Sequence, residues 1–119
     1  MPAPMIFKSE KARNFLLRRG IVVTFRPKKR KKNIEQTWAT PKYRGKKIAD
    51  IIVRFLCEVR REEIREKLDK HVALSGFKNV DEWIDEIKKL NKGEIPKKGY
   101  LYVVIKLPVE NVGYYFYLA

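Results

Sequence analysis

Hydrophobic and polar residues alternate along several stretches of this chain, which is the pattern of β-strands with one buried face. The first stretch, residues 21–26, reads IVVTFR and stops before Pro27, which has no amide hydrogen to donate to a neighbouring strand. The other stretches with this pattern cover residues 34–40, 48–60, 101–107 and 112–118. We expect all of them to be strands, with 112–118 pairing back as an edge strand whose tyrosines serve mainly as strand filling.

The stretch 48–60 places an apolar row on one face: Ile51, Val53, Phe55, Cys57 and Val59. Cys57 is therefore expected to be a buried core thiol, because the sequence shows no basic partner that would make it a nucleophile.

Three segments have apolar residues three and four positions apart, which predicts amphipathic helices. The first covers residues 9–18, with Ser9 as its cap and Gly20 as its left-handed stop. The second covers residues 62–70 and is followed by His71, which we expect to satisfy carbonyls or face solvent rather than do chemistry.

The third helix begins at Asn79, with Glu82 three residues later in a capping-box arrangement, and Gly93 ends it. Its expected buried stripe consists of Trp83, Ile84, Ile87 and Leu90.

The order of elements is helix, strand, basic loop, strands, and then a helix pair inserted before the closing strands. This order predicts an α+β fold with a small, barrel-like sheet. A chain of 119 residues, of which 45% are hydrophobic, is expected to form one domain over residues 1–119.

Charge divides the chain into two unlike halves. Residues 1–61 contain 18 basic and 4 acidic side chains, whereas residues 62–119 contain 10 of each, so the first half carries the whole net charge of +14. Such segregation produces a one-sided positive field and predicts an anionic partner such as nucleic acid.

The rest of the composition narrows the class of protein. One cysteine and one histidine allow no internal disulfide and no recognisable zinc site, so we expect no metal, no cofactor and a reducing cytoplasm. The apolar runs are too short to span a bilayer. We expect a monomer unless the chain is assembled in a ribonucleoprotein. Abundant lysine, glutamate and isoleucine with one glutamine are typical of thermophilic proteins.

A dense cationic run follows the strand 21–26, because six of the seven positions 26–32 are basic. We interpret it as a mobile loop that neutralises RNA phosphates, joined by a second basic turn after Pro41. Trp38 and Tyr43 lie between the basic clusters and could stack on bases, although Trp38 could equally be core. The residues expected to contact RNA are Thr24, Arg26, Lys28, Lys29, Arg30, Lys31, Lys32, Trp38, Lys42, Tyr43, Arg44, Lys46 and Lys47.

Two motifs resemble those of the ASCH domain family, which belongs to the PUA-like superfamily. One is the short helix that leads through Gly20 into Thr24-Phe25-Arg26, and the other is the segment SGFKNVDEW at residues 75–83 with the helix after it. The strand 101–107 completes a resemblance over roughly residues 9–107. It implies a PUA-like pseudobarrel whose cleft, between the first helix, the Thr-x-Arg strand and the inserted helices, binds RNA or modified nucleosides.

Some family members resemble amidohydrolases that remove an acetyl group from modified cytidine. Those members depend on a lysine three residues before the threonine and on a glutamate near the inserted helix. Here the lysine position holds Ile21, and the glutamate position falls on Ser75 or Gly76. None of these residues can relay a proton, so that chemistry would need a carboxylate from elsewhere, such as Glu58 or Glu82.

Three functions are compatible with this sequence. The favoured one is an RNA-binding module for structured RNA, such as ribosomal or transfer RNA, and the alternative is an enzyme that acts on RNA or a modified nucleoside, amidohydrolase-like or ribonuclease-like, through the Thr24 and Arg26 cleft. A binder of anionic membrane surfaces ranks last, because no amphipathic basic helix or lipidation signal accompanies the basic run.

Overall fold

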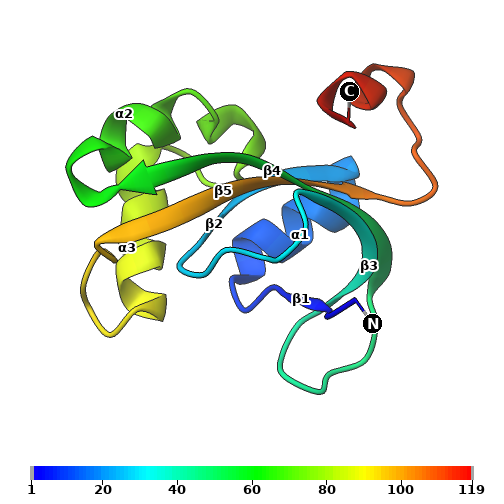
Figure 1. The fold of residues 1–119 in the computed structure, drawn as a ribbon, viewed down its shortest axis with the longest axis horizontal. Coiled ribbons are helices and arrows are strands. Elements are labelled where there is room, and N and C mark those ends of the chain that lie inside the picture. The colour runs from blue at the N-terminus through cyan, green and yellow to red at the C-terminus, as the bar shows by residue number, and fades with distance from the viewer. Residues whose placement is uncertain (1, 119) are drawn as a thin grey trace.

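A curled five-stranded sheet organises the molecule (Figure 1), in the order β1-β3-β4-β5-β2. The computed structural model describes residues 2–118. Its strands are β1 (Met5–Ile6), β2 (Ile21–Arg26), β3 (Ile34–Thr40), β4 (Ala49–Arg60) and β5 (Lys98–Lys106). Its helices are α1 (Glu10–Arg19), α2 (Ile64–Asp69) and α3 (Val80–Leu90), with 3-10 turns η1 (Arg61–Glu63), η2 (Val72–Leu74) and η3 (Val112–Leu118).

The sheet curls into a half-barrel, so the expectation of an α+β fold with a barrel-like sheet is confirmed at that level. The curl brings the two edge strands together, because Arg26 of β2 donates a hydrogen bond to the backbone carbonyl of Ile6 in β1. Strand β1 was not expected from the sequence. Two residues are too few to show alternation, and β1 pairs in parallel with β3, which lies far away in the chain.

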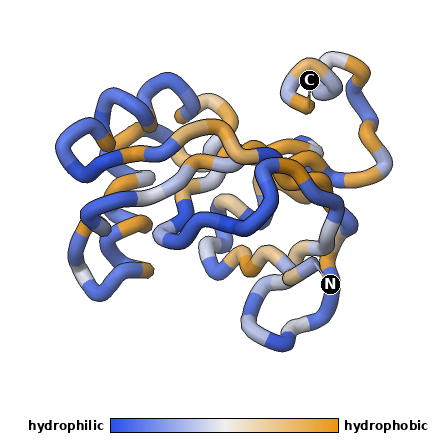
Figure 2. Tube along the Cα trace, viewed as in Figure 1, coloured by the Kyte–Doolittle hydropathy of each residue, from blue (hydrophilic) through white to orange (hydrophobic). Residues whose placement is uncertain are grey.

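Strand β5 lies at the centre of the core and is buried on both faces from Leu101 to Ile105. Its antiparallel register with β2 pairs Val23 with Val103 on one face and Thr24 with Tyr102 on the other. Two-residue alternation predicts Ile21, Val23 and Phe25 on one face of β2 and Val22, Thr24 and Arg26 on the other, and the register with β5 agrees. Figure 2 shows hydrophobic residues concentrated along the strands and hydrophilic ones along the connecting loops.

One predicted apolar row, that of β4, is wrong because the strand contains a β-bulge between Phe55 and Cys57. Before the bulge, Phe55 pairs with Tyr102; after it, Cys57 pairs with Leu101, whose side chain lies on the opposite face of β5. One extra residue shifts the register and exchanges the two faces of a strand. Cys57 is consequently half-buried rather than part of one continuous core row.

Local signals set both ends of α1 and the start of α3 as the sequence predicts. Helix α3 ends at Leu90, before the expected stop Gly93, and the Glu82 side chain accepts from the Lys78 amide instead of completing a capping box with Asn79. The Ser9 hydroxyl accepts a hydrogen bond from the Ala12 amide at 3.3 Å, and Gly20 has a left-handed φ of 79°. The Asn79 side chain accepts from the Glu82 amide at 2.9 Å. The expected stripe of α3 fails only at Leu90, which is 51% exposed because it lies at the mouth of a pocket rather than under it.

The expectation of a final edge strand is wrong, because residues 112–118 form the 3-10 turn η3, which stands apart from the sheet at the C-terminal end in Figure 1. Both edges of β5 are already paired, with β2 and β4, so the chain that follows β5 finds no free edge beside it. Tyr114 anchors the segment by donating a hydrogen bond from its hydroxyl to the Arg19 carbonyl at 2.9 Å. Phe116 remains 83% exposed.

A glycine in β5 controls how closely β2 packs. A Cβ atom at Gly99 would overlap the ring of Phe25, so we expect Gly99→Ala to lower the free energy of unfolding by about 2 kcal/mol through overpacking. Urea denaturation measures the effect, with Gly113→Ala as the control, because its added Cβ would meet only the Asn111 side chain.

Removing the ring tests the cause of that loss. The double variant Phe25→Ala/Gly99→Ala should lose less stability than the two single variants combined, because the overlap no longer exists. Strictly additive losses would contradict this packing.

Candidate functional site

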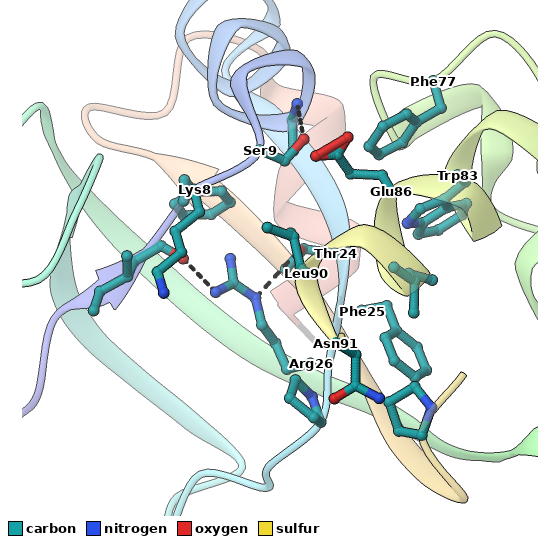
Figure 3. Close-up of a pocket in the computed structure, with 16 residues that line it drawn as sticks. Lys8, Ser9, Thr24, Phe25, Arg26, Phe77, Trp83, Glu86, Leu90 and Asn91 are labelled. Carbon is teal, nitrogen blue, oxygen red and sulfur yellow. Dashed lines mark hydrogen bonds between the residues drawn. The ribbon is translucent and has the colours of Figure 1, made fainter. Parts of the chain in front are cut away.

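A pocket of about 240 Å³ opens between the end of β2, the start of α1 and helix α3 (Figure 3). Most of its wall is apolar and aromatic, and a few polar side chains converge on it. The residues that line it are Ile6, Phe7, Lys8, Ser9, Ala12, Thr24, Phe25, Arg26, Pro27, Phe77, Trp83, Glu86, Ile87, Leu90, Asn91 and Pro96. This composition is typical of a small-ligand site.

Arg26 enters the pocket from the strand side. Its Nε donates to the Thr24 hydroxyl at 3.2 Å and Nη1 donates to the Ile6 carbonyl, while the Phe7 ring lies 4.7 Å from the guanidinium carbon. Burial lowers the pKa of Arg26 to about 10, and the charge of Arg30 adds to the shift. The side chain therefore remains a cation at neutral pH, held in one orientation.

The helix side of the pocket supplies the aromatic wall and a carboxylate. Phe77 and Trp83 stack at 6.1 Å between ring centroids with an interplanar angle of 13°. Glu86 follows Trp83 by three residues and therefore lies on the same face of α3, and Figure 3 shows its carboxylate directed toward Ser9 at the start of α1.

An ion pair ties the two helices that flank the pocket. Lys11 of α1 and Glu82 of α3 lie 2.7 Å apart. The hydrogen bond from Lys11, together with one from the Lys78 amide, lowers the pKa of Glu82 below its usual value.

The first basic loop, residues 27–33, leaves directly from the pocket at Pro27. Lys28, Lys29, Lys31 and Lys32 are exposed. The loop is held at Arg30, whose guanidinium pairs with Glu35 at 2.7 Å and bonds the Ala3 and Pro4 carbonyls, while its amide donates to Tyr102. The expectation of a freely mobile loop therefore does not hold at its centre, because Arg30 is used inside the molecule.

The second basic loop, residues 41–48, leaves from the other end of β3. Seven residues of strand put the two loops about 20 Å apart along β3. The structure thus does not merge the two predicted clusters into one patch. Lys42, Arg44, Lys46 and Lys47 are exposed, as is Tyr43 at 71%, whereas Trp38 is half-buried on β3 itself.

Thr24 and Arg26 are the two predicted site residues that the structure brings into the pocket. Lys8, Trp83 and Glu86 were not identified from the sequence. Trp83 is buried in the core of α3, as its place in the apolar stripe predicts, and it also lines the pocket. The three-residue spacing from Trp83 to Glu86 is the available signal, since it places both on one helix face. The spacing could not show that Trp83 and Glu86 line the same pocket as β2.

The residues at the two positions where amidohydrolase-like family members carry their lysine and glutamate serve the fold here. Ile21 is fully buried, and the buried Ser75 hydroxyl donates to the Val72 carbonyl at 2.7 Å and accepts from the Phe77 amide at 3.0 Å. Glu58 lies 3.4 Å from Lys98. The carboxylate that does line the pocket is Glu86.

The two residues set aside as non-catalytic lie outside the pocket. Burial raises the pKa of the half-buried Cys57 thiol and lowers the pKa of His71. Residues 2–118 contain no group of three or more histidine, cysteine or acidic residues placed to hold a metal ion. No helix in that range has the length and apolar character needed to cross a membrane.

Comparison with models of protein families, with curated proteins and with solved structures found no match to this chain.

The Lys11–Glu82 ion pair between α1 and α3 should make the stability of the fold depend on pH. A lowered pKa means that ionised Glu82 stabilises the fold above the usual glutamate pKa, and that this contribution is lost as pH falls through the lower folded value. Glu82→Gln should therefore lower the melting temperature at neutral pH, with the difference from wild type vanishing in strong acid.

The control is Glu66→Gln, which changes an exposed residue of α2 that forms no ion pair within residues 2–118. Equal melting curves of wild type and Glu82→Gln at neutral pH would show that the tie does not stabilise the fold.

Proposed function

We propose that this chain is an RNA-binding module in which exposed lysines hold phosphates and the pocket receives an unstacked base. The observation that carries this proposal is that the pocket and the exposed lysine loop are adjacent in the chain. Pro27 lines the aromatic pocket, and the exposed lysine loop begins at the very next residue, Lys28. Phosphate contacts and a base-sized cavity are therefore adjacent.

The charge distribution supports a phosphate backbone as the partner. The net charge of +14 comes from residues 1–61, which contain both basic loops. Lysines on a loop release counterions when they meet phosphates, and this supplies affinity that does not depend on sequence. Two loops about 20 Å apart along β3 suit an extended or folded strand that crosses the molecule.

The pocket favours single-stranded regions over a regular duplex. Bases of loops and bulges can turn outward and stack against aromatic side chains, whereas paired bases are not accessible in that way. Phe25, Phe77 and Trp83 line the pocket, and with exposed fractions of 9%, 9% and 2% they offer a base a small aromatic surface. Structured RNA with an unpaired loop is the partner that combines both features.

We also propose that the module is ASCH-like and that its half-barrel is of the PUA-like type. In support, Thr24 and Arg26 share a strand face, are hydrogen-bonded at 3.2 Å and line the pocket. The inserted helix α3 forms the opposite wall.

An enzyme that acts on RNA or a modified nucleoside is the second candidate. It is favoured by Glu86, a carboxylate that lines the same cavity as Thr24 and the Arg26 guanidinium. A carboxylate can act as a general base, and a guanidinium can stabilise a developing negative charge. Product formation from acetylated cytidine or labelled RNA that disappears in Glu86→Gln would favour this candidate over the binding module.

The salt dependence of RNA binding tests the module. Replacing Lys28, Lys31 and Lys32 with glutamine should weaken binding of a labelled single-stranded RNA, measured by fluorescence anisotropy. The slope of log affinity against log salt should become shallower by about 2, since each phosphate contact on a single strand contributes about 0.7.

The matched control replaces three exposed lysines of the second half, Lys70, Lys88 and Lys89, and changes the net charge equally. If both triple variants lose the same affinity, only net charge matters and the loop is not the contact surface.

A further inference from the structure

The two walls of the pocket carry opposite charges. Arg26 lies on the strand side and Glu86 on the helix side, with the Trp83 ring also on the helix side (Figure 3). A cavity of about 240 Å³ is smaller than the roughly 300–1,000 Å³ that drug-sized ligands occupy. The ligand that fits is therefore small and flat, with hydrogen-bond acceptors at one edge and donors at another.

Arg26 has a hydrogen-bonding nitrogen left for a ligand. Nε and Nη1 are engaged by Thr24 and Ile6, whereas Nη2 has no hydrogen-bond partner within residues 2–118. Figure 3 shows this third nitrogen pointing toward the side of the pocket where Ser9 and Glu86 lie. Its two N–H groups can donate to acceptors on a ligand.

Arg26 also lacks a counter-anion. No carboxylate of residues 2–118 forms an ion pair with it, and the nearby acidic residue Glu35 pairs with Arg30 instead. A half-buried charge without a counter-anion is costly, so electron-rich acceptor atoms of a ligand would relieve that cost.

Glu86 provides the complementary group. Its carboxylate is in no ion pair within the described chain, and its two oxygens can accept from two parallel N–H groups at once. Among the four RNA bases, only guanine presents two adjacent donors of this kind, at N1 and the N2 amino group. Guanine also presents the acceptor O6 beside N1, to which the free Nη2 of Arg26 can donate.

We propose that this pocket binds one unpaired guanine base, with the free Nη2 of Arg26 donating to O6 and Glu86 accepting from N1 and N2. The inference rests on the proposed RNA-binding function, because the guanine belongs to a single-stranded segment of the RNA. Adenine and cytosine place a ring-nitrogen acceptor beside their amino group, which repels the carboxylate. Uracil offers one N–H between two carbonyl oxygens.

The first experiment measures base preference by fluorescence anisotropy. Short oligouridines that differ only at one central position should bind about tenfold more tightly with guanine there than with adenine, cytosine or uracil. Inosine at that position lacks the N2 amino group and should lose most of the gain. Equal binding of guanine and inosine would overturn the contact with Glu86.

The second experiment uses a matched pair of variants on α3. Glu86→Gln, which leaves only one acceptor on the side chain, should bring the guanine oligonucleotide down to the affinity of the others. Asp85→Asn makes the same change of charge at the exposed neighbouring residue and should keep the tenfold preference. If Glu86→Gln keeps the preference as well, the proposal is wrong.

A third measurement separates the two possible sources of guanine and the two proposals. Guanosine alone, titrated by calorimetry, should bind weakly to the wild-type protein and not detectably to Glu86→Gln. If guanosine bound as tightly as the guanine oligonucleotide, the ligand would be a free nucleoside and not RNA. Steeply salt-dependent RNA binding without any base preference would overturn the guanine pocket and leave the RNA-binding module standing. The absence of RNA binding at low salt would overturn the module itself.

Discussion

The half-barrel of this protein depends on a guanidinium group that bridges its open seam. Strand order leaves β1 and β2 as the two edges of the sheet, and Arg26 of β2 bonds the Ile6 carbonyl of β1 while the Phe7 ring covers it. The bond satisfies a carbonyl at an otherwise unpaired edge. Thr24 orients the same group from two residues earlier on the same strand face. The seam and the pocket thus share one side chain.

Because Arg26 both bonds the opposite edge strand and lines the pocket, the fold itself orients one wall of the site. A cation that bridges the two edge strands of the half-barrel is held rigidly, and rigid groups bind ligands with less loss of conformational entropy. Helix α3 completes the pocket from the other side, where Trp83, Ile84 and Ile87 are buried in the core, and the surface Lys11–Glu82 ion pair at 2.7 Å adds a contact to α1. Arg30 fixes the adjacent loop by pairing with Glu35, and Lys29 adds a hydrogen bond to Asn33 at 3.2 Å, while Lys28, Lys31 and Lys32 remain exposed.

Much of the fold could be predicted from local patterns. Ser9, Gly20 and Asn79 mark helix ends because caps and left-handed stops act within a few residues. The faces of β2 followed from simple alternation. The bulge at Phe55 and Cys57 could not be predicted, because it arises from the register against β5 rather than from the residues of β4. The aromatic residues of 112–118 predict a strand, but this segment forms the turn η3 because β5 offers it no free edge to pair with.

The sequence by itself determined the caps of α1 and α3, the concentration of positive charge in residues 1–61, and the placement of Thr24 and Arg26 on one strand face. These depend on neighbours in the chain. Only the tertiary structure decided that Glu86 lines the same cavity as Arg26, that Arg30 is an internal anchor, and that β3 separates the two basic loops. Those relations arise when the sheet curls and buries apolar surface, which brings together residues that no sequence spacing connects.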